Sequence, residues 1–373
     1  MKKKVNIRDK IQNEAAEEII KNRYHCLIHI SPRVGKSKLV IDALNKVNRS
    51  LDVLILAPKK PILESWQVEI VKWKLKEGIS IDYSWSNSLK KCKTTYDLII
   101  ADEIHEYNKK VLDLLQNHID NNTRIIALTG TLDSDTEYAV TKNLKIPLVY
   151  EYSIEQAIND KVIADYEIIC IGCELDNVNK YVKAGNEEKV FYQTELEAYT
   201  YWNNQYNLAV TRKRWSSLKF LMSAKLNIIY NSLTKVNVTK QLLETLDKQR
   251  CLIFTGRQEI ADIIVTHSFH SKSEEDTLTM FKEGTISRLA IVSMISMGVS
   301  IFNLKIAIFN QLKSNKNLCI QQTMRVLNME DNRKATIYII YLKNTQDTIW
   351  VEKALQGFNK NKIKYIDYFP EWK

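Results

Sequence analysis

The feature that most constrains the fold is a unit that recurs along the chain: a short apolar run, a polar turn, and then a helical pattern. Apolar runs without alternation are typical of parallel strands that are buried on both faces. Apolar residues spaced three and four apart place their side chains on one face of a helix. The pattern therefore predicts doubly wound parallel sheets of the α/β class. The predicted strands are His25–Ile30, Leu51–Ala57, Tyr96–Ala101, Arg124–Leu128, Tyr166–Ile171, Cys251–Thr255, Leu289–Ser293, Leu304–Phe309 and Ala335–Tyr341.

The unit occurs in two sets, and 373 residues are enough for two domains. We predict a first domain over residues 1–154 and a second over residues 155–373. Only nine glycines are present, which excludes glycine-rich linkers and collagen-like repeats.

Residues 174–248 are polar, rich in aromatic side chains and free of strand signals after the first few positions, so we expect a helical elaboration on the second domain. Its aromatic residues either pack these helices together, which we favour, or stack on bases.

The net charge of +10 favours a polyanionic partner. Residues 1–165 carry 26 basic and 23 acidic side chains (+3), which leaves 28 and 21 (+7) for residues 166–373. Such an excess attracts phosphates but does not read a base sequence. A nucleic-acid bias is therefore expected in the second half.

Six scattered cysteines and the lack of an apolar signal-peptide core favour a reducing, cytoplasmic compartment. Cys170 and Cys173 have the spacing of half a zinc site, but two cysteines in a buried strand are the favoured interpretation. No apolar run approaches the roughly 18 residues of a membrane span. We therefore expect neither a metal at these cysteines nor a membrane partner.

A phosphate-binding loop is indicated directly after the first predicted strand. The segment ends in Gly-Lys-Ser and is followed by a helical pattern, an arrangement in which backbone N–H groups and the helix N-terminus meet phosphate oxygens. Lys36 then reaches the β and γ phosphates, and Ser37 offers its hydroxyl to Mg²⁺. Ile30 stands where the usual pattern has its first glycine. The predicted nucleotide contacts are Arg33, Val34, Gly35, Lys36, Ser37 and Lys38.

Two acidic residues, Asp102 and Glu103, follow the third predicted strand. We expect this strand to neighbour the first, so that Asp102 holds the Mg²⁺ that Ser37 also touches. Glu103 is then placed to orient and deprotonate the attacking water. A solvated acidic turn is the alternative, and the presence of both motifs at strand ends argues against it.

These motifs resemble those of the superfamily 2 helicases and translocases of DExH type, and the resemblance covers nearly the whole chain. It implies two RecA-like lobes that use ATP and Mg²⁺. Ile7–Ala15 resembles the adenine-recognition element, which implies that Gln12, with Arg8 nearby, reads the base. Ala57-Pro58-Lys59-Lys60, followed by Leu63 and Trp66, resembles the first nucleic-acid-contacting motif. Thr129-Gly130-Thr131 resembles the element that couples hydrolysis to lobe movement, and Thr129 is also expected to contact the nucleic acid. The resemblance further implies that His105 links the Mg²⁺ site to the lobe interface.

The second half carries further motifs of the same family. Thr255-Gly256-Arg257, His270-Ser271 and Ser293 resemble elements that grip the nucleic-acid backbone, and Gly298 with Ser300 resembles the fifth motif, at the nucleotide. Gln321-Gln322-Thr323-Met324-Arg325-Val326-Leu327-Asn328 resembles the sixth, which implies catalytic roles for Gln321 and Arg325. Met324 replaces a glycine and Asn328 replaces the second arginine, so ATPase activity is expected from a motif that is less complete than the family pattern. The short chain is most similar to phage-encoded helicases of the branch-migrating type.

The resemblance thus implies an ATP-dependent helicase or translocase that acts on single-stranded or branched DNA through backbone contacts, RNA being less favoured. A monomer in the cytoplasm of a bacterium or a phage-infected host is expected. A nearly inactive nucleic-acid-binding protein that keeps the fold is the alternative suggested by Asn328 and the atypical loop. A P-loop ATPase that acts on a protein partner leaves the second-half motifs unexplained.

Overall fold

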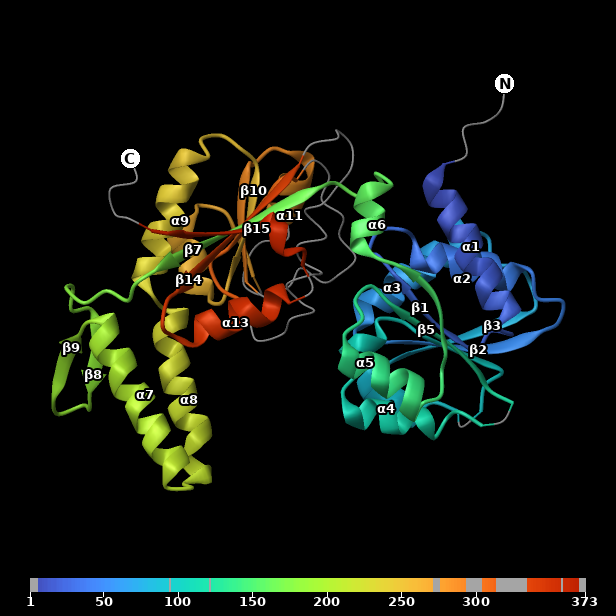
Figure 1. Ribbon diagram of the computed structural model, residues 1–373, viewed down its shortest axis with the longest axis horizontal. Coiled ribbons are helices and arrows are strands. Elements are labelled where there is room, and N and C mark those ends of the chain that lie inside the picture. Colours follow the sequence, from blue (N-terminus) through green and yellow to red (C-terminus); the bar gives the residue numbers. More distant parts are fainter. Residues whose placement is uncertain are drawn as a thin grey trace. The chain divides into compact units, whose positions relative to one another are not determined.

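The structure is a computed structural model that describes residues 6–93, 95–120, 122–270, 276–292, 304–312, 334–356 and 358–368. The described residues form two compact units, one ending at Asp165 and the other beginning at Tyr166 (Figure 1). Each unit is built around its own parallel β-sheet.

The first unit holds a six-stranded sheet of order β3-β2-β4-β5-β1-β6, in which all pairs of neighbouring strands are parallel. Its central strands are buried along almost their whole length. This burial is why they are continuous apolar runs in the sequence. The elements are α1 (Ile7–Lys21), β1 (Cys26–Ile30), α2 (Lys36–Asn45), β2 (Leu51–Ala57), α3 (Lys60–Lys72), β3 (Ile79–Trp85), η1 (Ser86–Lys91), β4 (Leu98–Ala101), η2 (Ile104–Glu106), α4 (Lys109–Gln116), β5 (Arg124–Thr129), α5 (Ser134–Tyr138), η3 (Ala139–Asn143), β6 (Leu148–Tyr152) and α6 (Ile154–Asn159).

The second unit holds a seven-stranded sheet of order β11-β12-β10-β13-β14-β7-β15, again with parallel neighbours throughout. A separate antiparallel pair, β8-β9, lies outside this sheet. The elements are β7 (Tyr166–Cys173), β8 (Val182–Gly185), β9 (Val190–Gln193), α7 (Glu195–Thr211), α8 (Trp215–Tyr230), α9 (Leu233–Thr245), β10 (Cys251–Thr255), α10 (Gln258–Ile264), β11 (Ser268–Phe269), α11 (Asp276–Glu283), β12 (Arg288–Val292), β13 (Ile306–Phe309), β14 (Ala335–Leu342), α13 (Gln346–Leu355), η4 (Lys360–Lys362) and β15 (Ile363–Asp367).

The prediction of two α/β lobes with parallel sheets is confirmed, and each predicted strand is present within a few residues of its expected bounds. Four strands of the two sheets were not predicted. They lie at or beside a sheet edge and are partly exposed, so polar residues interrupt the apolar run that marks a buried strand. These strands are β3, β6, β11 and β15.

The segment 174–248 is mostly helical, as expected, and comprises α7, α8 and α9. The expectation that it lacks strands is wrong, because β8 and β9 pair as a hairpin. Each of the two strands has only four residues, and these are partly or fully exposed, so no long apolar run marks the β8–β9 hairpin in the sequence. Gly185, with φ of +96°, and Asn186 were the available turn signal.

Two further sequence expectations concern cysteines and membranes. Cys170 and Cys173 lie buried in β7. Among the described residues, no group of three or more His, Cys, Asp or Glu side chains is arranged to hold a metal ion. Within the described parts of the chain, no helix combines the length and the apolar character that a bilayer-spanning helix needs.

A buried ion pair fixes the carboxyl edge of the second sheet. The Lys235 ammonium lies 2.8 Å from Asp347 Oδ2 and 2.7 Å from Gln311 Oε1, and the side chains of Lys235 and Asp347 are only 1% and 2% exposed. Gln311 also donates to Asp347 Oδ1 at 3.2 Å. The network joins three segments that are distant in sequence: α9, α13 and the residues that follow β13.

We expect Asp347→Ala to lower the free energy of unfolding of the second unit by about 3–5 kcal/mol, because a buried ammonium loses its counter-charge. Guanidinium unfolding followed by circular dichroism measures the change. Asp367→Ala is the matched control: its carboxylate pairs with Lys343 at 2.7 Å but is 56% exposed, so a loss of at most about 1 kcal/mol is expected. Equal losses in the two variants would contradict the assignment.

Candidate nucleotide-binding site

The loop between β1 and α2 has the form of a phosphate-binding loop. β1 ends at Ile30, and α2 begins at Lys36, so the free N–H groups of the helix N-terminus open at the carboxyl edge of the sheet. Gly35 precedes the helix with φ of +101°. This φ favours glycine, and a Cβ there would come within 2.5 Å of Gln12 Nε2 and force that amide to move.

Arg33 also adopts a left-handed conformation, with φ of +69°. The resemblance places glycine at this position, and the backbone keeps the glycine-like conformation although the residue is arginine. The strain costs roughly 1 kcal/mol or more, which the surrounding loop must hold in place. Burial, with a contribution from the Arg8 charge, lowers the pKa of Arg33 to about 10, so the guanidinium remains cationic near neutral pH.

Lys36, Asp102 and Glu103 converge at this edge. The Lys36 ammonium lies 2.5 Å from Glu103 Oε1 and 4.0 Å from Asp102 Oδ1. The expectation that the two strands are neighbours is wrong, because β5 lies between β4 and β1 in the sheet. Gly130, after β5, fits this narrow space: a Cβ there would lie 3.4 Å from the Lys36 ammonium.

The Asp102 carboxylate is held by two hydrogen bonds. Trp66 Nε1 donates to Oδ2 at 2.8 Å, and the backbone N–H of Glu103 donates to Oδ1 at 2.9 Å. Burial raises the pKa of Asp102, and the Lys36 charge opposes this effect. The carboxylate therefore has a fixed orientation before any ligand binds.

Glu103 adopts the left-handed conformation, with φ of +48°, at the start of η2. Burial would raise the pKa of this carboxyl, but the Lys36 ammonium and neighbouring groups hold it below its usual value. Its second oxygen, Oε2, is buried without a hydrogen-bond partner in the described part of the chain and lies 3.5 Å from His105 Nδ1. An ionised carboxylate with one free oxygen is suited to accept a proton from water.

His105, Thr129 and Thr131 form a buried cluster beside these acids. His105 Nδ1 lies 2.8 Å from Thr129 Oγ1, and this hydroxyl also donates to the backbone carbonyl of Thr131. Burial lowers the pKa of His105, so the imidazole is neutral at neutral pH. The structure thus brings together the three residues predicted to couple hydrolysis to movement.

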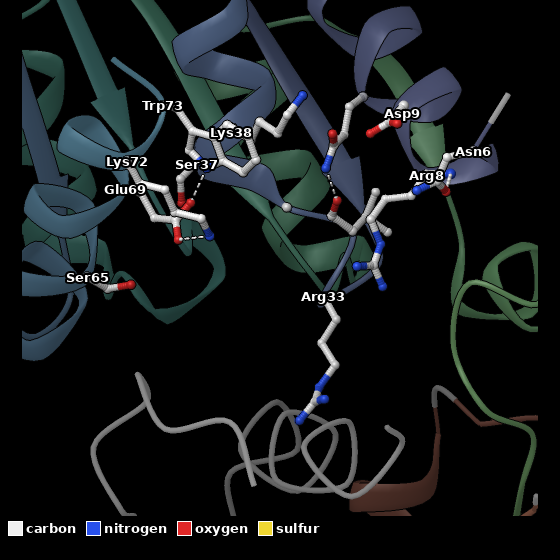
Figure 2. Close-up of a pocket in the computed structure, with 13 residues that line it drawn as sticks. Asn6, Arg8, Asp9, Arg33, Ser37, Lys38, Ser65, Glu69, Lys72 and Trp73 are labelled. Atoms are coloured by element: carbon white, nitrogen blue, oxygen red, sulfur yellow. Dashed lines mark hydrogen bonds and ion pairs between the residues drawn. The ribbon is translucent and has the colours of Figure 1, made fainter. Parts of the chain in front are cut away.

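A pocket of about 410 Å³ lies beside the N-terminus of α2 (Figure 2). Gln12 Nε2 donates to the Val34 carbonyl at 2.5 Å, whereas Gln12 Oε1 is buried with no hydrogen-bond partner among the described residues. A buried acceptor without a donor is costly unless a ligand supplies one. The predicted nucleotide contacts that line this pocket are Arg8, Gln12, Arg33, Val34, Gly35, Ser37 and Lys38, and it is also lined by Asn6, Asp9, Ser65, Glu69, Lys72 and Trp73.

The predicted metal ligands are compatible with Mg²⁺. Ser37 and Asp102 supply a hydroxyl and a carboxylate, the oxygen ligands that this ion prefers, and Mg²⁺ takes its other ligands from phosphates and water. The preset Asp102 carboxylate is the observation that supports this fit.

The predicted nucleic-acid contacts of the first unit follow β2. Pro58 and Lys59 follow the end of the strand, and Lys60 begins α3. The Lys59 ammonium lies 3.2 Å from Glu106 Oε2, and the Lys60 ammonium lies 5.7 Å from the centre of the Trp85 ring. Thr129 is fully buried, so its hydroxyl faces His105 and not solvent.

In the second unit, Thr255 and Gly256 lie at the carboxyl end of β10. The Arg257 guanidinium donates to Asn227 Oδ1 and lies 5.8 Å from the Tyr230 ring. His270 follows β11 and contacts Asp262 at 3.4 Å. Six predicted residues lie outside the described part of the chain: Ser271, Ser293, Gly298, Ser300, Gln321 and Arg325.

Trp66 is the site residue whose contact the sequence analysis missed. Its place in an apolar helical pattern predicted burial, and it is 1% exposed. The available signal was chemical: a buried tryptophan usually needs an acceptor for its N–H. The acceptor is Asp102, which directly follows β4 and could not be assigned to Trp66 from spacing.

The two parallel-sheet units have the architecture of RecA-like helicase lobes. In the first unit, the loop of phosphate-binding form faces the paired acids Asp102 and Glu103. Consistent with this class, the chain is 23% identical over 376 residues to DNA 3'-5' translocase XPB2 of Sulfurisphaera tokodaii, covering 93% of this chain and 84% of that protein. This similarity supports a relationship to the superfamily 2 helicases and translocases. No protein-family model matches the chain.

Solved structures share the fold at low sequence identity. The ATP-dependent Type ISP restriction-modification enzyme LlaBIII, bound to DNA, matches with a TM-score of 0.62 and 13% identity over 100% of this chain, which spans only 32% of that enzyme. S. cerevisiae Dbp5 bound to RNA and ADP BeF3 matches with a TM-score of 0.59 and 11% identity, covering 96% and 89% of the two chains. The Pyrococcus furiosus Hef helicase domain matches with a TM-score of 0.51 and 13% identity, covering 94% and 98%.

Proposed function

We propose that this protein is an ATP-dependent DNA translocase or helicase of superfamily 2, of DExH type. The observation that carries the proposal is the convergence of Lys36, Asp102 and Glu103 at one sheet edge. A phosphate ligand, a metal ligand and a candidate base thus lie together next to a pocket that can take a nucleotide. The similarity to a DNA translocase and to a DNA-bound enzyme supports DNA as the partner.

In this proposal each residue has a separate task. Lys36 exchanges its contact with Glu103 for the β and γ phosphates, which frees the Glu103 carboxylate to take a proton from the attacking water. Trp66 keeps Asp102 oriented toward the metal. Bound Mg²⁺ would neutralise charge that develops on the phosphates. Lys59 contacts Glu106, which lies three residues after the proposed general base Glu103. Nucleic acid that binds Lys59 would therefore act on a residue close to Glu103 in the chain.

Phosphate release, measured without nucleic acid and with single-stranded DNA, branched DNA or RNA, tests the proposal. We expect strong stimulation by DNA. Absence of turnover under every condition would instead support a nucleic-acid-binding protein that keeps only the fold. Turnover that is indifferent to nucleic acid would favour an ATPase with a protein partner. Stimulation by branched DNA above that by single strands would support the closer similarity to branch-migrating phage helicases.

Base recognition gives a second test of the same site. We expect Gln12→Ala to lower kcat/KM for ATP by roughly 10- to 100-fold and to lower that for GTP by less, because the variant loses the amide that pairs with adenine, whereas both nucleotides lose its hydrogen bond to the Val34 carbonyl. Initial rates with the two nucleotides measure the preference. Asn13→Ala, an exposed change on the same helix, should leave it unchanged. A Gln12→Ala protein that still prefers ATP would contradict this assignment.

A further inference from the structure

A helical hairpin formed by α7 and α8 extends from the second unit (Figure 1). The helices are joined by Arg212-Lys213-Arg214, which are all exposed. At its base the hairpin is fixed by Glu195, whose carboxylate accepts hydrogen bonds from the Asp176 and Thr234 backbones. The distal part contributes few buried residues, so its side chains are not required by the core.

The charge of this hairpin has one sign over most of its length. No acidic residue occurs between Glu197 and the end of α8 at Tyr230, whereas residues 198–230 contain five Lys and Arg side chains. Four of these cations are exposed at or near the turn, namely Arg212, Lys213, Arg214 and Lys219. An uncompensated cluster of exposed cations produces a positive potential that attracts a polyanion.

Large aromatic side chains are exposed beside these cations. Trp215 is 66% exposed, Phe220 65% and Tyr201 50%. Trp202 makes edge contacts with Tyr201 and Phe220, with ring centres 5.0 and 5.9 Å apart. The expectation that the aromatic residues of this segment pack its helices together holds for Tyr199, which is 7% exposed, and for the contact of Trp202 in α7 with Phe220 in α8, but it does not account for the large exposed area of Trp215. Exposed aromatic rings together with exposed cations are the combination found in surfaces that bind single-stranded nucleic acid.

We propose that the tip of the α7–α8 hairpin is an additional binding surface for single-stranded DNA, separate from the motifs at the sheet edges. Arg212, Lys213 and Arg214 contact phosphates, and Trp215 and Phe220 stack on unpaired bases. Paired bases are already stacked within a duplex, so exposed rings select single strands. The choice of DNA rests on the proposed function, but the binding itself requires no ATP hydrolysis.

Fluorescence anisotropy with a labelled oligo(dT), at several salt concentrations, tests the surface in the full chain. We expect Trp215→Ala to weaken binding by about 5-fold or more, since a base stacked on a ring contributes ~1–3 kcal/mol. Trp215→Phe keeps a ring and should recover most of the affinity. The triple variant Arg212→Ala/Lys213→Ala/Arg214→Ala should reduce the slope of log Kd against log salt by about two, because each lost phosphate contact removes roughly 0.7.

A matched control removes three exposed lysines from the first unit, Lys109→Ala/Lys110→Ala/Lys142→Ala, and should keep the wild-type slope. Hairpin variants with wild-type melting temperatures that bind oligo(dT) as the wild type does would overturn the proposal. So would an equal loss of duplex affinity. If the wild type proves to be a dimer in light scattering, hairpin variants that are monomers with unchanged DNA affinity would also overturn the proposal, because the rings would then bind a second copy of the chain. Wild-type ATPase without DNA stimulation would instead contradict the proposed function, and the binding measurement would still decide this inference.

Discussion

Lys36→Ala is expected to reduce ATP hydrolysis by about 100- to 1,000-fold. The Lys36 ammonium lies 2.5 Å from Glu103 Oε1 and 4.0 Å from Asp102 Oδ1, and removing a group that stabilises transition-state charge typically costs about 3–4 kcal/mol. The loss should be seen both with and without DNA, because it removes a phosphate ligand and not a nucleic-acid contact. Phosphate release under saturating ATP measures it.

Folding must be separated from chemistry in this variant, since the change also leaves Glu103 and Asp102 without their cation. The melting temperature without nucleotide reports that effect directly. Lys46→Ala removes an exposed ammonium from the end of the same helix and should keep wild-type rates. A folded Lys36→Ala protein that retains DNA-stimulated hydrolysis would remove the basis for the proposed function.

Glu103→Gln is expected to lower kcat by about 100- to 10,000-fold, the usual contribution of a general base. The amide keeps the shape of the side chain and an oxygen for Lys36, but it cannot take a proton from water. Nucleotide binding should therefore survive, so the effect should fall on kcat and much less on the affinity for a fluorescent nucleotide. This division distinguishes Glu103 from Lys36, whose loss removes a phosphate ligand.

The matched control is Glu64→Gln, which changes an exposed carboxylate on α3 in the same unit. It should hydrolyse ATP at the wild-type rate. If Glu103→Gln keeps a tenth or more of the wild-type kcat, another group must activate the water. The buried His105 beside Glu103 would then be the next residue to test.

The fold was predictable where local pattern and burial coincide. β4 and β10 are fully buried and therefore appear as unbroken apolar runs. β15 lies at the edge of its sheet and has partly exposed residues, so it lacks this signal. The order of strands was also beyond reach, because crossover connections decide whether β5 lies between β4 and β1, and no local pattern records that choice.

The candidate site shows the same division. Lys36, Ser37, Asp102 and Glu103 could be placed because parallel strands bring their carboxyl ends to one edge. Trp66 contacts Asp102 across 36 positions of sequence, so no spacing rule connects them. The left-handed conformation of Arg33 was likewise unpredictable from an arginine, because its side chain gives no reason for a positive φ.

In the proposed function, the hydrogen bond from Gln12 to the Val34 carbonyl couples base selection to triphosphate binding. A nucleobase that displaces or strains the Gln12 amide also displaces the backbone that cradles the phosphates. Discrimination between nucleotides should then be expressed in the turnover of a bound triphosphate as well as in its affinity. An engineered change of base preference would need compensating changes in residues 31–35, and altering Gln12 alone would impair hydrolysis before it created a new preference.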